Sequence, residues 1–287
     1  MGVWDRSWAI TRTSFGLIGK DKEMLWFPVL SGIFSLLFAA ALLVPTFVLQ
    51  ILEHTGKGRL VVGPAQYAVL FVTYFGLSFI ATFFNVCVVH TTRVRLSGGD
   101  ATFMDSIKFA LSRAHLIAAW SVVSATVGLL LRGLDSLAER AGLIGRILLS
   151  ILRSMLASAW AIITVFVVPA MVYKDLGPFA AIGDSLSTLK KTWGESLVRY
   201  YGLGLATFVC MLPCIGLVLA GIFVVGSAPP LGLALIALGI VGFLAVSLLF
   251  GVAGTVFNTV LYHWATTGAV QEGIEPSVLS GAFTVRR

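Results

Sequence analysis

Charged residues are scarce in this chain of 287 residues, at 11% of the sequence, whereas hydrophobic residues make up 58%. Soluble domains usually contain about a quarter charged residues, so the composition predicts an integral membrane protein. All 13 acidic residues lie outside the long apolar runs. Because proton and cation pathways usually need a carboxylate inside the bilayer, proton-coupled transport and carboxylate-based proteolysis within the membrane lose support.

Cysteine is also rare, and the three present, Cys87, Cys210 and Cys214, all fall in apolar runs. We interpret them as small packing residues, because a redox role requires thiolate-stabilising charges that the neighbouring sequence lacks. The sequence contains no Ser/His/Asp set, Gly-rich phosphate loop or HExxH zinc motif. No enzymatic activity, metal or cofactor is therefore predicted.

Six long apolar runs are what the sequence does contain, and each exceeds or approaches the roughly 20 residues that a helix needs to cross a bilayer. The predicted fold is an all-α polytopic membrane helix bundle, a single transmembrane domain over residues 1–270 with a short cytoplasmic tail at 271–287. The charged stretch from Arg132 to Arg146 is expected to form a short surface helix between the third and fourth spans. The predicted spans cover residues 24–52, 65–90, 115–134, 147–173, 196–225 and 231–264.

Three amphipathic segments share offsets of 0, 4, 7 and 11, which mark one face of an α-helix, and these positions are apolar except for Thr11 in the first segment. In each the fourth residue is a serine: Ser7, Ser106 and Ser185. We interpret them as interfacial helices that each precede a helical hairpin, giving three repeats at 1–98, 99–176 and 177–270, the middle one degenerate. The alternative is that an amphipathic helix before a hairpin is a common membrane pattern. The four positions are Trp4, Trp8, Thr11 and Phe15; Phe103, Ile107, Ala110 and Ala114; and Ile182, Leu186, Leu189 and Trp193.

Basic residues are distributed unevenly between the two predicted sides of the membrane. Of the 20 lysines and arginines, fourteen lie on the side of the termini and six on the other. Because cytoplasmic loops carry an excess of Lys and Arg, both termini and the three interfacial helices are predicted to be cytoplasmic. The net charge of +7 follows the membrane-flanking segments and forms no dense cluster beside aromatic residues, so nucleic acid is not an expected partner.

Two polar pairs within the apolar runs are candidate site residues. Phe84-Asn85 followed by His90 in the second span has the same spacing as Phe257-Asn258 followed by His263 in the sixth. The asparagines either make interhelical hydrogen bonds or line a pseudo-symmetric cavity. The histidines are interpreted as interfacial residues, because two imidazoles without a third ligand at helical spacing make a poor zinc site.

The interfacial segments carry a second set of candidates, which combine aromatic and basic residues. Tryptophan suits the headgroup region, and Lys and Arg can meet anionic lipid phosphates. Simple anchoring, specific lipid binding and docking of a protein partner are all compatible with this composition. The candidate lipid-headgroup or partner-facing residues are Trp4, Trp8, Arg12, Lys108, Arg113, Lys190, Lys191 and Trp193.

Several short motifs resemble an uncharacterised family of prokaryotic integral membrane proteins. They are SATVGLLLR at residues 124–132, Val-Val-Pro at 167–169, Gly-Pro at 177–178 and KTWGE at 191–195. The resemblance covers nearly the whole chain and implies the prokaryotic cytoplasmic (inner) membrane, but no activity. A looser likeness is to the membrane domain of some glycerophosphodiester phosphodiesterases, whose catalytic domain this chain lacks.

Two functions are compatible with these features. The first is a non-enzymatic scaffold, accessory or lipid-organising component, which binds membrane lipids and is compatible with protein partners or a homo-oligomer. The second is a carrier or channel for a small or lipid-like molecule, with a cavity lined by Asn85 and Asn258. A continuous cavity that reaches both asparagines would distinguish the second from the first.

Overall fold

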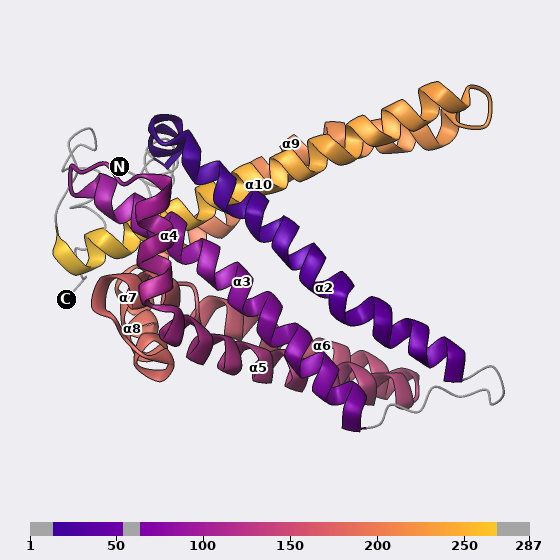
Figure 1. Ribbon diagram of the computed structural model, residues 1–287, viewed down its shortest axis with the longest axis horizontal. Helices are drawn as coiled ribbons and strands as arrows, with labels where there is room; N and C mark the ends of the chain where they lie inside the picture. The colour runs from indigo at the N-terminus through magenta and orange to yellow at the C-terminus, as the bar shows by residue number, and fades with distance from the viewer. Residues whose placement is uncertain (1–13, 54–63, 269–287) are drawn as a thin grey trace. The chain divides into compact units, whose positions relative to one another are not determined.

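The computed structural model describes residues 14–53 and 64–268, and within these ranges the regular secondary structure is helical (Figure 1). Residues 14–20 are helical and lead into the 3-10 helix η1. The remaining elements are η1 (Lys22–Leu25), α2 (Trp26–Glu53), α3 (Pro64–Leu96), α4 (Phe103–Ser112), α5 (Ala114–Arg140), α6 (Leu143–Ile163), α7 (Val167–Lys174), α8 (Pro178–Lys191), α9 (Trp193–Val224) and α10 (Pro229–Thr267).

Six segments of this structure are long and apolar enough to cross a membrane, which confirms the predicted all-α fold and the number of spans. The segments are Lys22–Pro45, Tyr67–Leu96, Ala114–Arg140, Leu143–Lys174, Ala206–Val224 and Pro229–Thr267. The last is 39 residues long, well beyond the roughly 20 residues that span about 30 Å of hydrocarbon.

The fourth span differs from a single uninterrupted helix. Helix α6 ends at Ile163, residues 164–166 form turns, and α7 begins at Val167. Pro169 explains the break, because its ring has no N–H to donate and clashes with the carbonyl of the residue four positions earlier. That residue is Val165, which lies within the interruption.

The prediction of a separate short surface helix between the third and fourth spans is wrong. Helix α5 continues without a break to Arg140, and α6 begins at Leu143 after a two-residue link. The residues from Leu134 to Arg140 are mostly Leu, Ala, Glu and Arg, which favour a helix. Nothing in that stretch stops α5 before Gly142, so the charged segment extends the span.

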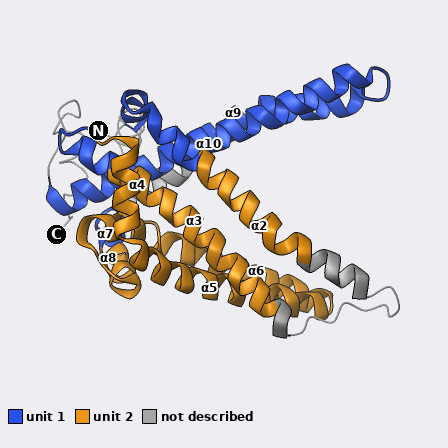
Figure 2. Ribbon diagram, viewed as in Figure 1, with its two compact units in different colours: residues 1–28, 91–100, 188–287 blue, residues 29–90, 101–187 orange. Residues whose placement is uncertain are grey.

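The helices form two compact units, each assembled from segments that are distant in the chain (Figure 2). Unit 1 contains residues 1–28, 91–100 and 188–287, and unit 2 contains residues 29–90 and 101–187.

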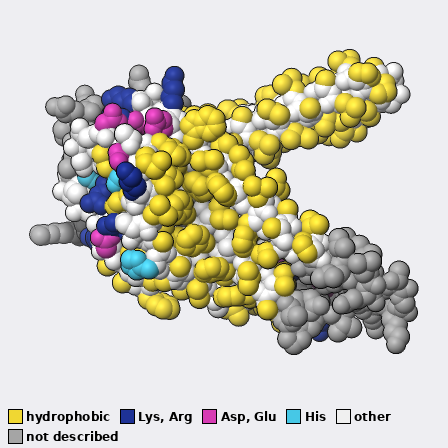
Figure 3. Space-filling model, viewed as in Figure 1, with side chains coloured by type: hydrophobic (Ala, Val, Ile, Leu, Met, Phe, Trp, Pro, Cys, Tyr) yellow, Lys and Arg dark blue, Asp and Glu magenta, His cyan; other side chains and the backbone are white. Residues whose placement is uncertain are grey.

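In unit 1, α9 and α10 pack against each other through glycines that allow their backbones to approach closely. A Cβ added at Gly232 would lie 2.5 Å from the Cα of Val225, and one added at Gly239 would lie 2.8 Å from the carbonyl oxygen of Cys214. Hydrophobic side chains cover much of the visible face of this hairpin (Figure 3). Leu219, Phe223 and Leu233 are among its exposed hydrophobic residues. Residues near the start of the chain also pack on α10, since the rings of Phe15 and Phe250 meet edge to face at 5.7 Å.

In unit 2, α5 and α6 form a pair in which the rings of Trp120 and Trp160 stack at 5.7 Å. The fully buried side chains come from the C-terminal half of α3, from α4, from the start of α5 and from α7 and α8. They include Val86, Ala110, Ile117, Phe166, Val172 and Ala181. The core of unit 2 is therefore concentrated where the two short helices α4 and α8 meet the ends of the spans.

Candidate functional site

The candidate site is a group of polar side chains and one aromatic ring in unit 2, which we term the polar cluster. It comprises His90 of α3, Ser106, Phe109 and Arg113 at α4, Lys174 and Asp175 at the end of α7, and Asp184 and Ser185 of α8.

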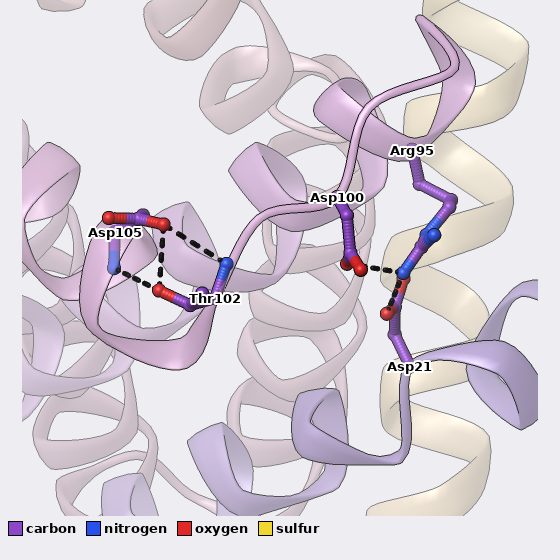
Figure 4. Close-up of polar contacts among 5 residues, drawn as sticks. All are labelled: Asp21, Arg95, Asp100, Thr102 and Asp105. Atoms are coloured by element: carbon purple, nitrogen blue, oxygen red, sulfur yellow. Dashed lines mark hydrogen bonds and ion pairs between the residues drawn. The ribbon is translucent and has the colours of Figure 1, made fainter.

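Helix α4 begins with a capping box. The Thr102 side chain accepts a hydrogen bond from the Asp105 N–H, and the Asp105 carboxylate accepts from the Thr102 N–H at 3.2 Å and from its hydroxyl at 2.7 Å (Figure 4). These hydrogen bonds from Thr102 lower the pKa of Asp105, and the nearby Lys108 acts in the same direction. Such boxes satisfy N–H groups that the first helical turn leaves without partners, so they fix where α4 starts.

Ser106 joins α4 to the end of α3. Its side chain is fully buried, and its hydroxyl forms a hydrogen bond with Nδ1 of His90 at 3.2 Å. The thiol of Cys87 donates to the Ser106 carbonyl at 3.5 Å. The candidate residue His90 is therefore hydrogen-bonded to a buried serine of the same protein.

Ser185 joins α8 to the break between α6 and α7. The Ser185 hydroxyl donates to the Ile163 carbonyl at 2.5 Å and accepts from the Phe166 N–H at 3.1 Å. Both backbone groups belong to the interrupted part of the fourth span, where an unpartnered buried group is unfavourable by about 1–3 kcal/mol. One side chain from α8 thus replaces helical hydrogen bonds that the break removes.

An aromatic and ionic stack completes the polar cluster. The rings of His90 and Phe109 stack at 4.0 Å, and the Arg113 guanidinium lies 4.0 Å from the centre of the Phe109 ring. Arg113 also forms a bidentate ion pair with Asp175, at 2.6 and 3.0 Å. Asp175 ends α7 in the left-handed conformation with φ 51°, so its ion pair holds a backbone geometry that most residues disfavour.

A second ion pair in the polar cluster links Lys174 at the end of α7 to Asp184 of α8, at 2.5 Å. Together with Ser185, it attaches α8 to the fourth span at two successive residues. Unit 1 has a network of its own, in which Arg95 bridges Asp21 and Asp100 (Figure 4).

The predicted cavity residues fall in two units. Asn85 and His90 belong to unit 2, and Asn258 and His263 belong to unit 1. The Oδ1 atom of Asn85 is buried without a hydrogen-bond partner, while Asn258 and His263 are half-buried. Among the described residues, no three His, Cys, Asp or Glu side chains are grouped so that they could hold a metal ion.

The predicted lipid-facing or partner-facing residues differ in their exposure and in their contacts. Lys108, Lys190 and Lys191 are exposed on α4 and α8, whereas Arg113 is engaged with Asp175 and Phe109. Trp193 is the first residue of α9 and not part of α8. Trp4, Trp8 and Arg12 lie outside the described residues, as does Ser7.

The partners of Ser106 and Ser185 are what the sequence did not reveal. The sequence did draw attention to the serines themselves, because a serine is the fourth residue of each amphipathic segment. Nothing in the sequence indicated that one would bind a histidine and the other a broken helix. The sequence also did not indicate that Asp175 would end α7 in the left-handed conformation, because Gly or Asn usually occupies such a position.

In the described residues, six apolar segments that are long enough to cross a membrane define a multi-pass integral membrane protein. The chain belongs to the family of unknown function DUF6159, whose model matches residues 64–272. This match confirms the resemblance to an uncharacterised family, while the looser likeness to the membrane domain of glycerophosphodiester phosphodiesterases stays an expectation. No curated protein and no solved structure matches the chain.

Proposed function

We propose that this protein is a non-enzymatic component of the prokaryotic cytoplasmic membrane, a scaffold that holds α4 and α8 in fixed positions for contact with lipids or a protein partner. The observation that carries the proposal is the pair of buried serines. Each serine also contacts a span residue 19 positions earlier: the Cys87 thiol donates to the Ser106 backbone carbonyl, and the Phe166 N–H donates to the Ser185 hydroxyl. The equal separation also supports an internal repeat.

The charged side chains of the polar cluster support a structural role. Arg113 with Asp175, and Lys174 with Asp184, each connect one helix to another. Each pair links two neighbouring helices, and because one partner of each is exposed to solvent, each pair contributes about 0.2–1 kcal/mol. A scaffold needs such rigidity more than it needs free acids or bases.

The proposed orientation of the protein in the membrane rests on the distribution of its basic residues. Lys108, Lys190 and Lys191 are exposed on the short helices, on the side where most lysines and arginines lie. Because the excess of positive charge is usually cytoplasmic, this distribution supports a cytoplasmic location for α4, α8 and both termini. A C-terminal reporter that is active only outside the cytoplasm is expected to stay inactive, and an active reporter would overturn this orientation.

A carrier for a small or lipid-like molecule is the second candidate, and Asn85 favours it. Its Oδ1 atom is buried and has no hydrogen-bond partner in the structure, although an acceptor inside a membrane usually finds a donor. A transported molecule with a hydroxyl or amine could supply that donor.

Reconstitution into sealed vesicles separates the two candidates. For a scaffold, the release of a trapped dye and the flipping of a fluorescent phospholipid should match the rates of protein-free vesicles. Any protein-dependent flux would overturn the scaffold, and its loss in Asn85→Leu would establish the carrier.

Cells provide a second test of the same choice. A strain with Ser106→Val and Ser185→Val, at normal protein levels, is expected to share the defect of the deletion strain. A strain with Asn85→Leu is expected to grow as the wild type does. The opposite pattern would contradict the scaffold.

A further inference from the structure

Helices α4 and α8 both expose large apolar side chains, although their inner faces also bury apolar residues such as Ala110 and Ala181. The inward side chains include the hydroxyls Ser106 and Ser185, both fully buried, whereas large apolar side chains point outward. Met104 and Leu111 of α4 are 54% and 58% exposed, and Phe179 and Leu186 of α8 are 80% and 38% exposed. Exposed apolar surface of this kind is unfavourable in water and favourable against lipid.

The exposed face of α4 is divided lengthwise. With about 100° between successive residues, Met104 and Leu111 lie within about 20° of each other around the helix axis. Lys108, Ser112 and Asp105 follow at about 40°, 80° and 100° from Met104, and all three are exposed. An apolar strip is therefore bordered by a lysine and then by polar residues.

The exposed face of α8 has the same order. Phe179 and Leu186 lie within about 20° of each other, and Lys190, Ser187 and Lys191 follow at about 20°, 80° and 120° from Phe179. All of these residues are exposed. The two helices have different sequences at these positions, yet each has an apolar strip, a lysine and a polar strip in turn.

We propose that the outward faces of α4 and α8 dock on the anionic headgroup layer of the bilayer, with the apolar strips inserted and the lysines at the phosphates. The order of the strips fits this surface, because apolar residues enter the acyl boundary while Lys extends its amine to the headgroups. Charge complementarity favours anionic lipids at α8, where Lys190 and Lys191 are both exposed. On α4, Lys108 borders the apolar strip, and the acidic Asp105 lies farther around the helix from it. The proposal rests on the cytoplasmic placement of α4 and α8 proposed above, and it makes the inner leaflet their binding surface.

Each helix provides a matched pair of adjacent residues for a test. Leu111 and Ser112 are neighbours in α4, as are Leu186 and Ser187 in α8, and all four are exposed. Each is changed to cysteine in turn in the full chain, with Cys210→Ala and Cys214→Ala, and is labelled with an environment-sensitive fluorophore. The parent with no added cysteine gives the background, since Cys87 is buried.

The labelled proteins are reconstituted in vesicles of phosphatidylglycerol and phosphatidylcholine. Labels at Leu111 and Leu186 should be quenched by a shallow lipid-attached nitroxide at least about twofold more than those at Ser112 and Ser187, since an inserted face reaches about 5–10 Å into the boundary. Aqueous iodide should show the opposite preference. Equal iodide quenching within each pair would overturn the proposal and would indicate a face that contacts water or a protein.

The lysines are tested by lipid charge. In vesicles of phosphatidylcholine alone, or with Lys108→Gln and Lys190→Gln, the nitroxide quenching at Leu111 and Leu186 should fall toward that of the serine positions. Quenching that is independent of lipid charge would overturn the role of anionic headgroups. Vesicle flux is unaffected by these outcomes, so failure of this proposal and failure of the scaffold are distinguishable.

Discussion

The α9–α10 hairpin of unit 1 and the polar cluster of unit 2 are held together in different ways. In the hairpin, Gly221, Gly232 and Gly239 bring two backbones into close contact. In the polar cluster, Ser106, Ser185 and two ion pairs connect helices through side chains. Lipid removes most of the hydrophobic drive between helices, so close packing dominates there, whereas polar links are useful where short helices meet the ends of spans.

The largest predicted effect is in the hairpin. Gly232→Ala would place a methyl group 2.5 Å from the Val225 backbone, and an overpacked site usually loses about 1–3 kcal/mol, occasionally more. Backbone atoms cannot move aside as a flexible side chain can, so the upper part of that range is expected. The measurement is thermal unfolding in detergent or nanodiscs.

Gly251→Ala is the control for this substitution, because it lies in α10 with nothing within 4 Å of an added Cβ. Its effect should be neutral or stabilising, since Ala favours a helix over Gly by up to about 1 kcal/mol. Equal effects of the two changes would show that the hairpin does not depend on backbone approach.

The next effect is in the polar cluster. Ser185→Ala leaves the Phe166 N–H and the Ile163 carbonyl without their partner, and a loss of about 1–3 kcal/mol is expected. Ser187→Ala, on the exposed side of the same helix, should change stability by less than about 0.5 kcal/mol. Thermal unfolding of both variants checks the difference, and comparable losses would contradict the role of Ser185.

A smaller effect is expected at Asp175. Asp175→Ala removes the ion pair with Arg113 and places alanine at φ 51°. This left-handed conformation is unfavourable by about 1–2 kcal/mol for most residues, and only the part of that cost that Asp does not already bear is added by the substitution. The Asp175 side chain is 58% exposed, so solvent limits the pair itself to about 0.2–1 kcal/mol. Asp175→Asn keeps a residue that tolerates this conformation and should lose less stability than Asp175→Ala in the same measurement.

The smallest effect concerns pH. The pKa of Asp105 is below its usual 3.8 because of hydrogen bonds from Thr102, so its contribution to stability is present above pH 4 and is lost as pH falls through the lowered pKa. Unfolding followed from pH 5 downward should show a weaker decline in Asp105→Asn than in the wild type. An identical decline would show that the capping box does not titrate with folding.

The sequence alone was sufficient to predict the six membrane spans. An apolar run such as residues 231–264 is longer than a buried helix or strand of a soluble protein requires. The sequence was insufficient where tertiary contacts decide. Pro169 explains the break in the fourth span, but the sequence did not indicate that Ser185 of α8 supplies the missing hydrogen bonds. The charged stretch after Arg132 suggested a surface helix, yet local helix propensity carried α5 through it.

The candidate site was predicted in part for the same reason. The recurrence of Ser106 and Ser185 followed from helical periodicity, and the exposure of Lys108 and Lys190 followed from their place on the helix. The partners of Arg113 and His90 come from segments up to 62 residues away in the chain. Pairings at such a distance are set by how helices pack, which periodicity alone does not determine.

Unit 1 draws on both ends of the chain, and this has a consequence for biosynthesis. Phe15 leaves the ribosome early, whereas its partner Phe250 belongs to the last span. All segments of unit 2 have been translated once residue 187 is reached, but the helix at residues 14–20 must wait for α10 to enter the bilayer. The helix at residues 14–20 therefore reaches its place in unit 1 only after α10 has been inserted.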